Sequence, residues 1–186
     1  MRTSVKTLAA GSLAVASLLI APAAIAETST ATVGVTGGEL TASATNVTLT
    51  GVSTDHADQD TNGSVEVIVD DLSGTGAGWN VTQQVTTDFL YAGAFGGTDI
   101  PANNFSVSGV GAEGITSTSG ASTEGITTAG AGIGAIGTEA KTVLSATAGN
   151  GEGAYTVPLS VTLTVPADSR EGSYAATLTT TVSTAL

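Results

Sequence analysis

The feature that most constrains the fold is a strict alternation of apolar and polar residues at positions 157–165. Val157, Leu159, Val161, Leu163 and Val165 are separated by Pro, Ser or Thr. Since successive side chains of a β-strand point to opposite faces, this spacing predicts a strand with one buried and one solvated face. An antiparallel sheet that covers a core on one side has this pattern. The proline falls near the start of the predicted strand, where a missing N–H is tolerated.

The same alternation recurs elsewhere in the chain. A second row runs from Tyr174 to Val182, after a predicted turn at residues 166–172. Further strands are predicted at residues 39–50, 65–69, 79–85 and 141–146. Several short strands with turns between them and no helical periodicity predict an all-β fold, an antiparallel β-sandwich. We expect the last two strands to pair directly or to face each other across the core.

Segment 109–140 interrupts this pattern. It is rich in Gly, Ser, Thr and Ala, and its apolar residues have little periodicity. Long segments of this kind inside a compact domain are often functional or mobile loops. We therefore expect a long Gly/Ser/Thr-rich surface insertion here, containing one short strand or helical turn.

Residues 1–26 have the features of a secretory signal peptide. Arg2 and Lys6 make the start positive, an apolar run follows at residues 8–20, and small residues close the segment at Ala26. The apolar run is too short to span a bilayer comfortably. Cleavage before Glu27 would leave a single domain, residues 27–186, with no membrane span. We expect a secreted protein that stays on the cell surface without a covalent anchor.

The composition argues against several classes of function. The formal net charge is −12, from 16 acidic and 4 basic residues, and a surface of that sign repels nucleic acid and anionic lipid. The chain has no Cys and a single His, His56, so zinc sites and Cys- or Ser-His nucleophiles find no support. We expect no enzyme. A secreted hydrolase that uses a pair of carboxylates is the third alternative.

One segment is similar to the opening of a calcium loop. Residues 58–63 read D-x-D-x-N-G, with side-chain oxygens at alternate positions and a glycine for the turn. The candidate ligands are Asp55, Asp58, Asp60 and Asn62. The closing carboxylate of an EF-hand would fall at Val69, which has no side-chain oxygen. A hydrated acidic hairpin loop explains the same residues, so we expect no cofactor, with calcium as the alternative.

Two regions resemble the signature motifs of the WxL-domain family of bacterial cell-surface proteins. Residues 69–81 are similar to the stretch D-x-x-G-x-x-x-G-W-x-L and end in Trp79-Asn80-Val81. Residues 163–182 are similar to the ending L-x-V-P…G-x-Y-x-A-x-L-T-W-x-L. Two departures are clear. Val81 replaces the leucine of the first motif, and Thr180 replaces the tryptophan of the second, with Val182 two positions further on.

The resemblance implies non-covalent binding to the Gram-positive cell wall, in which the paired W-x-L motifs are implicated. The candidate contact residues are then Trp79, Val81, Thr180 and Val182. A buried sandwich tryptophan is the alternative for Trp79, because large aromatic side chains dominate core burial. We expect a non-catalytic surface protein that binds peptidoglycan or a complex of surface proteins.

A structural role is the main alternative function. The strands are rich in Thr, and segment 27–38 precedes the first predicted strand. A segment of this kind could add as an extra strand to the sheet of another molecule. The sequence is therefore also compatible with a self-assembling or partner-binding subunit, such as part of an adhesin.

Overall fold

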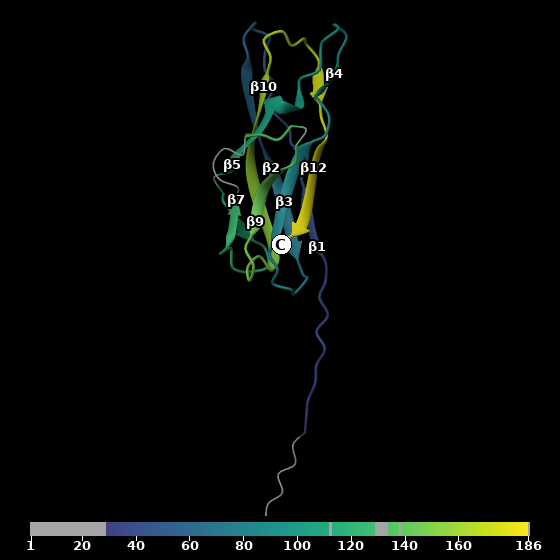
Figure 1. Ribbon diagram of the computed structural model, residues 1–186. Helices are drawn as coiled ribbons and strands as arrows, with labels where there is room; N and C mark the ends of the chain where they lie inside the picture. The colour runs from purple at the N-terminus through teal and green to yellow at the C-terminus, as the bar shows by residue number, and fades with distance from the viewer. Residues whose placement is uncertain (1–28, 112, 129–133, 138, 186) are drawn as a thin grey trace, which may run out of the picture. The chain divides into compact units, whose positions relative to one another are not determined.

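The computed structural model describes residues 29–111, 113–128, 134–137 and 139–185, which form strands, turns and a single 3-10 turn (Figure 1). The chain divides into two units, Met1–Gly34 and Val35–Leu186, and the second contains every strand. The predicted signal peptide, residues 1–26, lies outside the described residues. In the described ranges, no helix is long and apolar enough to cross a membrane.

Two antiparallel sheets make up the fold. Sheet A has the strand order β1-β2-β10-β5-β8, and β6 also pairs with β10. Its strands are β1 (Leu40–Ala44), β2 (Gln59–Asp71), β5 (Phe105–Val110), β6 (Thr116–Ser117), β8 (Gly134–Ala135) and β10 (Gly153–Val165). Sheet B has the order β12-β3-β9-β7. Its strands are β3 (Trp79–Val85), β7 (Ile126–Thr128), β9 (Lys141–Ala146) and β12 (Leu178–Thr184).

A third, small sheet pairs β4 (Leu90–Ala92) with β11 (Ser173–Ala175), and the 3-10 turn η1 (Ala102–Asn104) leads into β5. In Figure 1, β4 lies at the opposite end of the folded unit from the C-terminal end of β12. The two large antiparallel sheets confirm the predicted all-β sandwich.

The core lies between the two large sheets. Val157 and Leu159, in the inward row of β10, are fully buried, as are the valines of β2 opposite them. Sheet B contributes Trp79, Val81 and Leu144 from its inner face, also without exposure. The alternation seen in the sequence therefore places one row of each long strand in the core. Burial of these rows is the main term that favours the folded state.

Pro158 lies in the middle of β10, which is a central strand, and not near its start as predicted. Its carbonyl accepts from the N–H of Gly111 at 2.7 Å, so its backbone faces the side where β5 and β6 pair with β10. β6 pairs with Tyr155 and Thr156, and β5 begins to pair at Leu159. The missing N–H falls in the gap between these two partners and so removes no ladder hydrogen bond.

The C-terminal row is divided between two sheets. The residues from Tyr174 to Val182 form β11 and β12, with a break at residues 176–177. β10 belongs to sheet A and β12 to sheet B, so the last two long strands face each other and do not pair directly. Of the predicted strand at 39–50, only Leu40–Ala44 pairs as a strand.

The predicted insertion at 109–140 contains more strand than expected. Its described parts include β6, β7 and β8, each attached to a different strand of the sandwich. Ile126 and Ile136 are buried in the core cluster. These two isolated apolar side chains anchor a segment whose composition otherwise favours a loop.

We predict that Leu159→Ala destabilises the fold by about 3 kcal/mol, because it removes a fully buried side chain from the central strand. Ser160→Ala, on the opposite face of the same strand, is the matched control and should change the free energy of unfolding by less than about 0.5 kcal/mol. Urea denaturation measures both. Equal losses for the two variants would contradict the assigned facing of β10.

Candidate functional site

The tryptophan of the W-x-V motif is part of the core. Trp79 begins β3 and is fully buried, and its indole N–H donates to the carbonyl of Gly151 at 2.9 Å. Its ring lies 6.4 Å from that of Tyr155. Gly151 has φ of 84°, and a Cβ there would come within 2.6 Å of the indole nitrogen, so only glycine fits. This geometry favours the interpretation of Trp79 as a buried sandwich tryptophan. Its hydrogen bond to Gly151 also holds the loop between β9 and β10 against the core.

The other residues of the predicted wall contact lie beside it. Thr180 and Val182 are half-buried on β12, opposite Gln83 and Val81 of β3. The Gln83 amide donates to the Thr180 hydroxyl at 3.2 Å, while its own buried Oε1 has no partner in the described part of the chain. The structure thus gathers the four candidates on two neighbouring strands, with Trp79 and Val81 facing inward. Their contact with the wall stays a prediction.

Tyr155 completes the aromatic cluster at this end of the core. Its hydroxyl lies 2.8 Å from the carbonyl oxygen of Glu152 and 3.0 Å from that of Ser122. Burial, followed by the negative charges of Asp71 and Glu152, raises the pKa of the Tyr155 phenol. The phenol is therefore held in its neutral form, in which it donates to a backbone carbonyl.

The segment that resembles a calcium loop is not a loop. Gln59 begins β2, so Asp60 and Asn62 lie at alternate positions on the outer face of sheet A. Their Oδ1 atoms accept hydrogen bonds from the hydroxyls of Thr164 (2.6 Å) and Thr162 (2.8 Å). Residues 59–63 are extended as part of β2 because they pair with the C-terminal end of β10.

This arrangement does not bring the candidate ligands together. Alternate side chains of a strand start about 7 Å apart, and the Oδ1 atoms of Asp60 and Asn62 are each directed at a hydroxyl of β10 and not at a common point. Asp58 and Asp55 each hold backbone N–H groups instead, those of Ala167 and Ala57. Over the described ranges, no group of three or more His, Asp or Glu side chains is placed to hold a metal. The expectation of no cofactor, with calcium as the alternative, stays a prediction.

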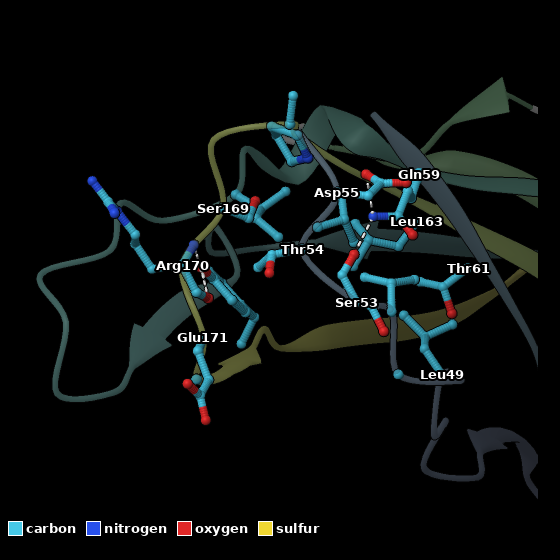
Figure 2. Close-up of a pocket in the computed structure, with 18 of the residues that line it drawn as sticks. Leu49, Ser53, Thr54, Asp55, Gln59, Thr61, Leu163, Ser169, Arg170 and Glu171 are labelled. Atoms are coloured by element: carbon cyan, nitrogen blue, oxygen red, sulfur yellow. Dashed lines mark hydrogen bonds between the residues drawn. The ribbon is translucent and has the colours of Figure 1, made fainter. Parts of the chain in front are cut away.

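A hollow at one end of the sandwich was not predicted, and we call it the end hollow (Figure 2). It encloses about 640 Å³ between the segment that leads into β2, the end of β10 and the turn before β11. Its apolar lining comprises Leu49, Val52, Ile100, Leu163, Val165 and Tyr174. In Figure 2, Leu49 and Asp55 lie on one side of the hollow and Arg170 and Glu171 on the other. A hollow of this size with an apolar floor and a polar rim suits a small organic group.

Hydrogen bonds hold the rim of the end hollow in place. Asp55 accepts from the Gln59 amide at 2.8 Å, and the same amide donates to the carbonyl of Ser53. On the other side, the Tyr174 hydroxyl donates to the carbonyl of Arg170 at 2.9 Å and accepts from its N–H. Both sides are therefore formed before any ligand binds. A preformed site loses less conformational freedom on binding.

This domain has few basic residues, and one of them lies at the end hollow. Beyond the predicted signal peptide the only basic residues are Lys141 and Arg170. Arg170 lines the end hollow. Lys141 begins β9 and pairs with Glu139 at 4.0 Å. Because the residues of the end hollow come from distant parts of the chain, no local motif could have indicated it.

We predict that the raised pKa of Tyr155 makes the fold sensitive to high pH. A pKa raised in the folded state gives stability that is fully present below the ordinary value of 10.0 and is lost as the pH rises through the raised value. Urea denaturation on either side of pH 10 should show a steeper loss for the wild type than for Tyr155→Phe. Tyr174→Phe is the control and should keep the wild-type slope. Equal slopes in all three proteins would contradict the assignment.

We also predict that calcium leaves the melting temperature unchanged. Since the oxygens of Asp60 and Asn62 are engaged with β10, binding would have to break the pairing at the end of the sheet. Calorimetry in a chelator and in about 1 mM calcium tests this, because a ligand that binds the folded state raises its melting temperature. A rise that Asp60→Ala abolishes would establish the site and overturn this prediction.

Comparison with known protein families identifies the family of this chain. The family model described as "WxL domain surface cell wall-binding" matches residues 26–185. This range includes every strand of both sheets and all of the described core. No curated protein and no solved structure matches the chain. The chain belongs to the WxL family of surface cell wall-binding domains.

Proposed function

We propose that this protein is secreted and held on the cell wall non-covalently, by its folded domain and without catalysis. The observation that carries the proposal is the extent of the family match, which runs from residue 26 through the last strand. The match covers nearly all of residues 27–186, which supports a single domain there. Attachment would therefore be a property of the sandwich itself. The sequence features of residues 1–26 support export.

The end hollow is the surface of this domain that best fits a wall component. A sugar ring has an apolar face of C–H groups and an edge of hydroxyls, which match the apolar floor and polar rim. Backbone and side-chain groups of Ser53, Thr54 and Ser169 line the rim and can exchange hydrogen bonds with hydroxyls. Arg170 lies at the rim, and in Figure 2 its guanidinium points away from the hollow, so its charge would meet the carboxylates and phosphates of a wall polymer outside the opening.

The lining of the end hollow supports binding over hydrolysis. Its carboxylates are Asp55 and Glu171. Asp55 already accepts hydrogen bonds from the Gln59 amide and from the N–H of Ala57. Held in this way, the Asp55 carboxylate stabilises the rim. Glu171, on the other side of the hollow, is exposed, whereas the acid of a glycoside hydrolase is held in a less polar environment beside the scissile bond.

A pull-down with purified peptidoglycan tests the proposal. We expect the chain that starts at Glu27 to sediment with the wall, and Arg170→Glu to weaken this binding about tenfold, because it replaces attraction by repulsion at the rim. Lys141→Glu is the matched control, with the same change of charge at a residue outside the end hollow, and it should bind as the wild type does.

Two outcomes would contradict parts of this proposal. Wild-type protein left wholly in the supernatant would overturn wall binding by this domain. Equal weakening by both charge reversals would keep wall binding but assign it to net charge and not to the end hollow. Melting temperatures of the three proteins show whether each variant is folded.

A further inference from the structure

The outer edge of sheet B offers free backbone groups. β12 is the terminal strand of this sheet and pairs only with β3. Two hydrogen bonds flank the pair, from Thr86 N–H to the Thr177 carbonyl (2.9 Å) and from Ala185 N–H to the Gly78 carbonyl (3.0 Å). In an antiparallel pair, bonded and non-bonded positions alternate, so the odd-numbered residues of β12 bond to β3. The even-numbered residues, Leu178 to Thr184, direct their N–H and C=O groups outward.

Within the described residues, these outward groups have no backbone partner. An unpaired edge of this length is a template for another strand. β12 has none of the usual protection, since it contains no charged residue and no proline. The outward N–H and C=O groups of β12 can therefore pair with an added strand.

An apolar strip lies beside this edge. β1, the outer strand of sheet A, runs next to β12 (Figure 1). The inward side chains of the two strands pack on the core cluster but keep part of their surface exposed, whereas those of the central strands are buried. We call them the β1–β12 strip, which comprises Leu40, Ala42, Ala44, Leu178 and Val182. They stay half-exposed because sheet B ends at β12 and no further strand covers them.

The chain also contains a segment with the sequence pattern of a strand that pairs with no described sheet. In residues 29–36, Ala31, Val33 and Val35 alternate with Thr or Gly, the pattern of a strand with one apolar face. Val33 is 89% exposed and Val35 is 91% exposed. Residues 29–35 are as many as the residues of β12. Residues 29–35 and the unpaired edge of β12 therefore match in length and in the alternation of their apolar side chains.

We propose that residues 29–35 of a second copy of this chain add to β12 as a further strand of sheet B. The backbone would pair with the outward groups of β12, while Ala31, Val33 and Val35 would cover the β1–β12 strip. The contact is heterologous, since a tail meets an edge, and repetition would give a ring or an open chain of domains. This assembly goes beyond attachment to the wall and does not depend on it.

The residues that follow this segment are fixed on the end of β2. The N–H of Gly38 donates to the carbonyl of Leu72 at 2.7 Å, and Glu39 accepts from the Leu72 N–H at 3.1 Å. These bonds hold the start of β1 on β2. A Cβ at Gly37 would lie only 2.0 Å from the Ser73 carbonyl oxygen, so this residue also packs against β2's end.

The first test measures assembly in solution. All strands and the described core lie after Glu39, so a chain that starts at Glu27 keeps the folded unit. Analytical ultracentrifugation over rising concentration should show reversible association of the wild type. Val33→Lys with Val35→Lys should raise the dissociation constant at least about tenfold, since it places two charges on the apolar strip. Thr32→Lys with Thr36→Lys adds the same charge on the opposite face and should associate nearly as the wild type does.

The second test locates the contact. Hydrogen exchange followed by NMR should slow at the amides of Leu178, Thr180 and Val182 as the concentration of wild-type protein rises. A peptide of residues 28–38 added to the labelled Val33→Lys/Val35→Lys protein should slow the same amides, whereas a scrambled peptide should not. A strict monomer at all concentrations would overturn the proposal. So would association that survives the double lysine variant, or protection that is absent from these amides.

Discussion

The pairing of β2 with β10 is the interaction on which the rest of this structure depends. Each strand has 13 residues, and they pair in register over their whole length, from Gln59 with Val165 to Asp71 with Gly153. Their inward rows form one wall of the core. Their two ends define the two ends of the sandwich, and each end carries a distinct set of side chains.

The two ends differ in how they are closed. At the β2 C-terminal end, Trp79, Tyr155 and the Gly151 carbonyl fill the space completely. At the other end, the segment before β2 and the turn after β10 border the end hollow, and Asp58 joins these two segments by accepting from the Ala167 N–H at 2.8 Å. The tryptophan that marks the family therefore closes one end of the core, while the opening is at the other. This separation is the reason to seek a ligand site away from the W-x-L motif.

Two parts of this strongly acidic domain carry little charge. Its outer β-edge and its N-terminal segment carry almost no charge, and its one basic residue at the end hollow stands apart from Lys141. Like-charge repulsion between copies is thus lowest where backbone pairing is available. The proposed wall attachment and the proposed strand addition would use different parts of the surface, so neither excludes the other.

Much of the fold could be predicted from local pattern, because a strand that faces a core must alternate. Residues 157–165, 65–69 and 141–146 were predicted as strands and are strands. The family motifs were recognised in the same way. Boundaries and partners could not be predicted, since they depend on pairing. Asp58 to Gly63 resembles a calcium loop in isolation, but the ladder with β10 extends it as a strand.

What the sequence by itself determined is the class of fold, the exclusion of cysteine chemistry and the family. Tertiary structure alone decided the sheet to which each strand belongs. It placed β12 at an edge and divided the C-terminal row, and it buried Trp79 behind a glycine at which no Cβ fits. The end hollow also exists only in three dimensions, because its residues come from segments far apart in the chain. Periodicity is a property of neighbours in sequence, whereas edges and hollows arise where distant segments meet or fail to meet.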